Sequence, residues 1–140
     1  MEQEEVILRK EYFMQARDLN DKIKEQREYI EKLRETLYSI GGCEYNERVQ
    51  TSLKQDRFAE AFAKIEEEEE YLKKMEENCA LLKFELINKI YDVKCSKNAK
   101  KVSELFFTKC LSTDAIAIEL GYSKNYISKM INDFIKYSLK

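Results

Sequence analysis

The chain has 140 residues, of which 37% are charged, and it contains three glycines but no proline, tryptophan or histidine. This composition favours long helices and argues against β-sandwiches and barrels, which need frequent Gly and Pro turns. Without histidine there is no imidazole base, His metal ligand or Ser-His pair, which argues against an enzyme, and we expect no metal, cofactor or small-molecule substrate.

An apolar stripe runs along the first forty residues and predicts a helix over about 4–40. Its members alternate in steps of three and four, the a/d pattern of a coiled coil, with one polar member, Gln26. Such a helix needs a partner, and Ser39-Ile40-Gly41-Gly42 is expected to end it because glycine suits a helix C-cap. The stripe consists of Tyr12, Ala16, Leu19, Ile23, Gln26, Ile30, Leu33, Leu37 and Ile40.

A second stripe predicts a helix over 53–93, after a linker at 41–52. The glutamate run 66–70 interrupts it at Glu68, which predicts a solvated or end-exposed stretch. Two such helices fold back as an antiparallel hairpin or pair between chains as a coiled coil, and periodicity does not choose. We expect a stalk over 1–93 and a homo-oligomer, most simply a dimer. The stripe consists of Ile65, Leu72, Cys79, Leu86 and Val93, with Ala61, Met75 and Leu82 on the same face.

Residues 94–140 differ in charge from the rest of the chain. They hold nine lysines against four acidic residues, a net charge of +5, whereas residues 1–93 hold 16 basic and 23 acidic residues, a net charge of −7. This asymmetry indicates an acidic scaffold that carries a basic domain. After a basic hinge at 94–101, short helices over 99–109, 113–119 and 124–137 are expected to form a second domain at 97–140.

Residues 113–132 meet the requirements of a helix-turn-helix. Ala117 is small where the helices cross, Gly121 suits the positive-φ turn, and Ile127 is a branched residue for the core. We expect Ser112 or Thr113 to cap the first helix and Ser123 to cap the second. The angle between the two helices is expected to be closed by Ile116, Leu120, Tyr122 and Met130. The preceding helix is expected to complete the core with Val102, Leu105 and Phe106, and Phe107 and Cys110 are expected to flank it.

The outward face of the helix at 124–137 carries lysine, asparagine and serine but no acidic residue. Recognition helices place such side chains on base edges in the major groove, where Lys donates to guanine and Asn bonds adenine. We therefore predict double-stranded DNA as the partner. The expected base-reading residues are Lys124, Asn125 and Lys129, then Ser128 and Asn132, and the expected phosphate contacts are Tyr126, Lys136, Lys97, Lys100 and Lys101.

The segment TDAIAIELGYSKNYISKMINDFIKYS resembles the region-4-type helix-turn-helix of sigma factors. The whole chain resembles phage sigma-like regulators of the RinA/ArpU kind, because Ser39-Ile40-Gly41-Gly42 and Leu120-Gly121-Tyr122-Ser123 match in kind and order. The resemblance implies a regulator of phage or prophage transcription and leaves contact with RNA polymerase open. This recognition helix has no arginine, which the family usually has, so its lysines offer point charges instead of bidentate forks.

The main alternative is a structural coiled-coil protein whose C-terminal helical unit docks a protein partner. An enzyme is a weaker alternative, because adjacent acids on a helix point in different directions and no nucleotide-binding glycine motif is present. The four cysteines show no C-x-x-C spacing and the chain opens on acidic residues, so reduced thiols in a cytoplasm are expected. No apolar run has the length of a membrane span.

Overall fold

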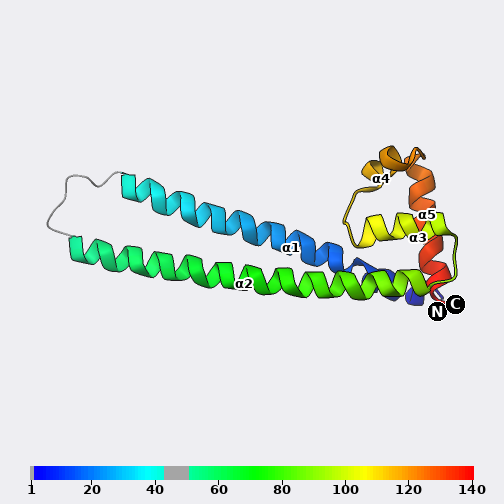
Figure 1. The fold of residues 1–140 in the computed structure, drawn as a ribbon, viewed down its shortest axis with the longest axis horizontal. Coiled ribbons are helices and arrows are strands. Elements are labelled where there is room, and N and C mark those ends of the chain that lie inside the picture. The colour runs from blue at the N-terminus through cyan, green and yellow to red at the C-terminus, as the bar shows by residue number, and fades with distance from the viewer. Residues whose placement is uncertain (1, 43–50) are drawn as a thin grey trace. The chain divides into compact units, whose positions relative to one another are not determined.

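The computed structural model describes residues 2–42 and 51–140, with side chains for 2–39 and 55–140. It is all-α: α1 (Glu2–Gly42), α2 (Thr51–Asp92), α3 (Lys97–Phe107), α4 (Thr113–Leu120) and α5 (Lys124–Ser138) follow in chain order (Figure 1). The prediction of two long helices before shorter ones is confirmed. None of the helices in the described ranges combines the length with the apolar character that a membrane span requires. The side chain of Ile40 and the whole of Cys43 lie outside the described part.

The two long helices extend further into the predicted linker than the sequence indicates. α1 includes Gly41 and Gly42, and α2 begins at Thr51, so the expected linker at 41–52 is too long. A terminal glycine weakens a helix without removing its backbone hydrogen bond. The expected hinge at 94–101 is also wrong from Lys97 onward, because Ser96 caps α3 by accepting a hydrogen bond from the Ala99 amide at 3.2 Å.

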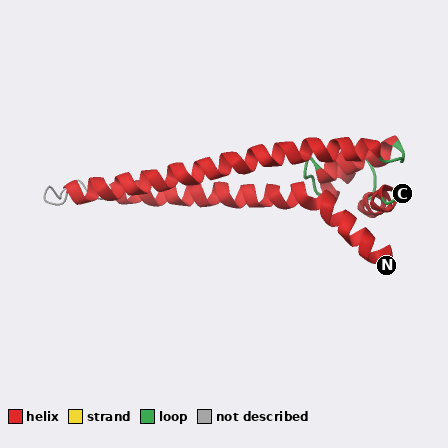
Figure 2. Ribbon diagram, turned by 90° about the horizontal axis from the view of Figure 1, so that it is seen from below, coloured by secondary structure: helices red, strands yellow, loops and turns green. Residues whose placement is uncertain are grey.

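The chain divides into two compact units, one of residues 21–77 and one of residues 1–20 with 78–140. In the 21–77 unit, α1 and α2 run antiparallel, since Arg27 pairs with Glu76 and Arg34 pairs with Glu69 (Figure 2). The predicted stripes face each other there, which gives a hairpin within one chain. One buried cluster there consists of Ile30, Leu37 and Ile65, with Leu33, Phe58, Ala61 and Leu72 packed against it, and Ile23 and Met75 are buried as well.

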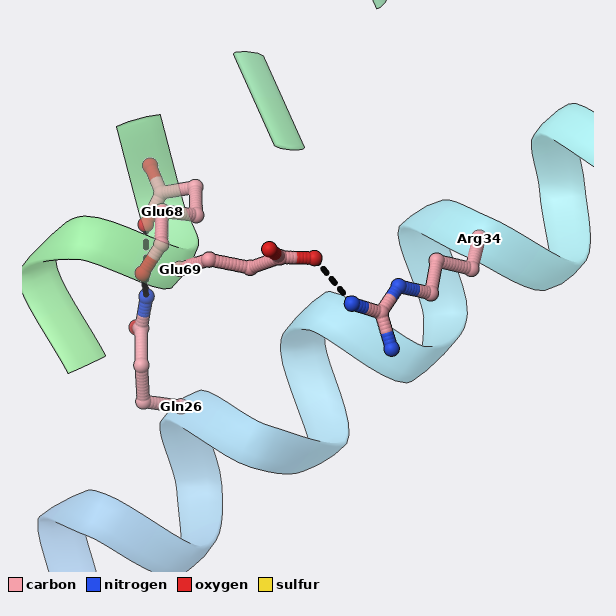
Figure 3. Close-up of polar contacts among 4 residues, drawn as sticks. All are labelled: Gln26, Arg34, Glu68 and Glu69. Carbon is pink, nitrogen blue, oxygen red and sulfur yellow. Dashed lines mark hydrogen bonds and ion pairs between the residues drawn. The ribbon is translucent and has the colours of Figure 1, made fainter. Parts of the chain in front are cut away.

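A polar pair lies on the stripes of this hairpin (Figure 3). The Gln26 amide Nε2 donates to Glu68 Oε2 at 2.6 Å and to the Glu68 carbonyl at 3.2 Å, while Lys64 Nζ lies 2.9 Å from the Glu68 carboxylate. The Gln26 hydrogen bond and the Lys64 charge lower the pKa of Glu68. The run 66–70 is exposed at Glu66, Glu67 and Glu70, as predicted, but the Glu68 side chain is only 18% exposed because it bonds Gln26 and Lys64. A slip in register would leave Gln26 without this acceptor, so the pair helps to fix the alignment.

The other unit has a larger apolar core with three phenylalanines at its centre. The ring of Phe13 lies 5.4 Å from that of Phe107 and 5.3 Å from that of Phe134. The expectation that Phe107 only flanks the core is wrong: its side chain is fully buried, while Phe106 is partly buried. The core also includes Ala16, Leu86, Ile90, Val102, Leu105, Ile116, Ala117, Ile127, Ile131 and Ile135.

Arg17, in the N-terminal half of α1, connects this helix to the short helices of the same unit through hydrogen bonds. Its Nη1 donates to the carbonyls of Phe106 and Leu111, both at 2.9 Å, and its guanidinium lies 4.1 Å from the centre of the Phe106 ring. The Phe106 carbonyl lies at the end of α3 and the Leu111 carbonyl lies in the connection to α4. Among the described residues, no backbone amide donates a hydrogen bond to the Leu111 carbonyl. Arg17 therefore helps to hold the helices that carry the predicted DNA-reading residues, a role that the sequence did not reveal.

Candidate nucleic-acid interface

The turn between α4 and α5 has the local geometry that its sequence predicts. Gly121 adopts φ 77° and ψ 27°, and its amide donates to the Ala117 carbonyl at 2.9 Å. Ser112 caps α4 by accepting from the Ala115 amide at 3.1 Å, and Ser123 caps α5 by accepting from the Tyr126 amide at 3.2 Å. The left-handed glycine ends one helix and two residues later a serine begins the next, which sets α5 at an angle to α4.

The angle between α4 and α5 is closed by fewer residues than expected. Ile116, Ala117 and Ile127 are buried there, and Leu120 and Met130 are partly buried against the same core. Tyr122 is 40% exposed instead, and its ring centre lies 4.9 Å from that of Tyr126. Tyr122 directly follows the left-handed glycine, which ends the helical repeat on which its predicted burial depended. The sequence pattern did not reveal this pair of exposed tyrosines.

α5 has two sharply different faces. Its buried face consists of Ile127, Ile131, Phe134 and Ile135. Across the helix lies a row of exposed residues spaced by steps of four, three and four, which we call the polar ridge. The polar ridge consists of Asn125, Lys129, Asn132 and Lys136. It contains no acidic residue, and its amides and ammonium groups are available to solvent.

The other three predicted site residues on α5 lie off the polar ridge. Lys124 is exposed, and its Nζ lies 3.5 Å from the Asp114 carboxylate, with side chains 62% and 66% exposed. The sequence predicts that the outward face of α5 has no acidic residue, but Asp114 of α4 lies beside Lys124, the first residue of that face. Ser128 is half-buried beside the core, and Tyr126 lies against Tyr122. The structure thus gathers four of the seven predicted residues in one row.

One of the lysines predicted to contact phosphates is engaged within the chain. Lys100 Nζ donates to the Tyr91 carbonyl at 3.1 Å and lies 6.0 Å from the centre of its ring. The Tyr91 hydroxyl donates to Glu104 at 2.6 Å, and this hydrogen bond raises the pKa of Tyr91. Lys97 and Lys101 are exposed. The contacts of Lys100 tie α2 to α3, so its first effect is on the packing of this unit.

No protein-family model, curated protein or solved structure matches this chain. The chemistry of the polar ridge is that of recognition: amides that donate and accept, and ammonium groups that donate. Such groups complement acceptors and donors on base edges and the charge of phosphates.

Proposed function

We propose that this chain is a sequence-specific DNA-binding transcription regulator that places α5 in the major groove. The observation that supports it is the polar ridge, four exposed Asn and Lys residues directly across the helix from a fully apolar face. Residues at this spacing share one side of a helix, so all four can meet the same stretch of groove. The +5 charge of residues 94–140 adds a sequence-independent attraction to phosphates.

In this proposal the residues divide between bases and backbone. Asn125 and Lys129, near the start of α5, read base edges together with Lys124, and Ser128 and Asn132 follow. Lys124 can exchange Asp114 for DNA at little cost, because exposed ion pairs contribute about 0–1 kcal/mol. The phosphate contacts are Tyr126, Lys136, Lys97 and Lys101, and Lys100 could join them by leaving Tyr91.

The resemblance to phage sigma-like regulators extends the proposal to a role. It favours a promoter of phage or prophage genes as the target and RNA polymerase as a second partner. A polymerase pull-down with the full chain tests the second partner separately from DNA binding. The interpretation as a protein-docking head has one observation in its favour, the 84% exposure of Ile118 on α4.

DNA binding by the full chain tests the proposal. A pool of random duplexes is selected on the protein, and anisotropy of the selected duplex is followed across a salt series. We expect affinity to fall steeply with salt and Lys129→Glu to weaken binding at least about 10-fold. Asn125→Ala should relax base preference by about 1–3 kcal/mol at one position.

Lys24→Glu is the matched control, because it reverses an exposed lysine on α1 that lies in the 21–77 unit. It should leave DNA affinity close to that of the unaltered chain. Absence of binding at low salt contradicts the proposal, as does an equal loss in Lys129→Glu and Lys24→Glu. A protein partner captured through Ile118 with no DNA affinity would favour the docking-head alternative.

A further inference from the structure

α2 has a second apolar face in the unit of residues 1–20 and 78–140. Its core side is formed by Leu82, Leu86 and Ile90, which pack against α1 and the short helices. On the side away from the core, Leu81 is 70% exposed and Phe84 is 68% exposed. Large apolar side chains with this exposure, three residues apart, form a continuous patch that the described part of the chain leaves open to solvent.

The exposed patch follows the spacing of a coiled-coil seam. Leu81, Phe84, Asn88 and Tyr91 are separated by steps of three, four and three, and all four are exposed. We call these four residues the α2 outer face. Tyr91, which closes it, is 49% exposed although its hydroxyl donates to Glu104. A helix with apolar stripes on two sides has one more partner surface than its own hairpin uses.

We propose that the α2 outer face pairs with the same face of a second copy of this chain, with the two helices parallel. The first argument for a second copy is Asn88. In parallel pairing Leu81 and Asn88 occupy a positions and Phe84 and Tyr91 occupy d positions, so each layer joins identical residues. A single asparagine at an a position bonds its own counterpart, and it selects two chains in register at some cost in stability.

The second argument is the charge of the flanking residues. In a parallel pair the residue before each a position approaches the residue after the d position of the partner. Here Ala80 meets Glu85 of the second copy and Ile87 meets Asp92 of the second copy, so no like charges oppose each other. Electrostatic repulsion therefore does not oppose pairing of two copies. Because the seam is short, covering only residues 81–91, the association should depend on protein concentration.

Parallel pairing has a consequence for DNA recognition that rests on the proposed function. Equivalent residues face each other across the two-fold axis, so both copies present their short helices at the same end of the pair. Two-fold readers bind half-sites about 34–36 Å apart or multiples of that. The selected duplex should then contain an inverted repeat.

Sedimentation equilibrium of the full chain over a range of concentrations tests the proposal. We expect a reversible dimer, with Leu81→Glu/Phe84→Glu raising the dissociation constant about 30-fold or more. Circular dichroism should be unchanged in this variant, because both residues lie away from the core. Ile118→Glu is the control, since it places one such negative charge at an even more exposed apolar residue and should leave the dimer intact.

Two further variants examine register and direction. Asn88→Leu should tighten association and allow assemblies larger than two. Leu81→Cys should give a disulfide-linked dimer under mild oxidation. In a mixture of Leu81→Cys and Tyr91→Cys chains, a chain of one variant should not cross-link to a chain of the other, because positions 81 and 91 face each other only in antiparallel pairing. The unaltered chain, with its own cysteines, provides the background.

A chain that stays monomeric at the highest concentration overturns the proposal, and so does a dimer that persists in Leu81→Glu/Phe84→Glu. Predominant cross-linking of Leu81→Cys with Tyr91→Cys overturns the parallel arrangement. These results are distinct from failure of DNA binding: a monomer that binds DNA leaves the proposed function standing, and a dimer without DNA affinity leaves this interface standing.

Discussion

Each of the two compact units is stabilised internally by a different kind of interaction. The unit of residues 1–20 and 78–140 encloses an apolar core in which Phe13, Phe107 and Phe134 meet. The 21–77 unit has a small core and relies in addition on polar pairs between α1 and α2, such as Gln26 with Glu68 and Arg27 with Glu76. Full burial of one large apolar side chain contributes about 1.5–3 kcal/mol, whereas an exposed ion pair contributes about 0–1 kcal/mol.

This difference predicts unequal local stability along the same two helices. Amide hydrogens of α1 and α2 in the 21–77 unit should exchange with solvent through local opening reactions of lower free energy than amide hydrogens of the same helices in the other unit. The unit with the larger core also carries α4 and α5, so the predicted reader has the firmer support. Changes made in one unit should therefore affect that unit first.

The largest effect is expected from Phe107→Ala. Removing this fully buried ring leaves a cavity in the aromatic cluster and should lower the free energy of unfolding by about 3–5 kcal/mol. Hydrogen exchange should show the loss mainly in residues 1–20 and 78–140. Phe62→Ala, which alters a 50% exposed ring on α2, is the control and should cost much less. Equal loss of protection in both units would break the comparison.

Gly121→Ala should destabilise the same unit by a smaller amount. A β-carbon at this position meets nothing within 4 Å, so the cost comes only from the left-handed backbone, about 1–2 kcal/mol. Denaturant unfolding measures it, and Gly121→Asn should cost less because asparagine tolerates this conformation. If alanine and asparagine cost the same, backbone conformation does not explain the requirement for glycine.

Ser103→Ala should stabilise the protein. The Ser103 hydroxyl is fully buried in α3 and has no hydrogen-bond partner among the described residues. Alanine removes this buried polar group and suits a helix better, which should add about 1 kcal/mol to the free energy of unfolding. Thermal denaturation checks the sign. A loss of stability would show that the hydroxyl bonds in solution.

The smallest effect is expected from the titration of Glu68 in the 21–77 unit. Its pKa is lowered in the folded chain, first by the Gln26 hydrogen bond and then by Lys64. The stabilisation is therefore present at neutral pH and is lost as pH falls through the folded pKa. Hydrogen exchange at neutral and acidic pH should show greater acid sensitivity of residues 21–77 in the unaltered chain than in Glu68→Gln. Identical sensitivity would remove Glu68 from the account.

For some contacts, the sequence identifies the individual residues as unusual but does not show that they meet. Gln26 and Glu68 each stand out as a polar interruption of an apolar stripe, but periodicity does not specify which residue of one helix faces which residue of the other. Lys124 belongs to a basic helix in the sequence, and only the angle between α4 and α5 brings Asp114 to it. The DNA-reading role of the polar ridge stays a prediction.

The primary sequence determined the helices, their buried stripes and the α4–α5 turn, because helical periodicity, serine caps and the left-handed glycine act between neighbours in the chain. Tertiary structure alone decided that Phe107 lies at the centre of the core and that Arg17 binds the Phe106 and Leu111 carbonyls. Each of these depends on side chains from distant segments meeting in space, and spacing along the chain carries no record of such meetings.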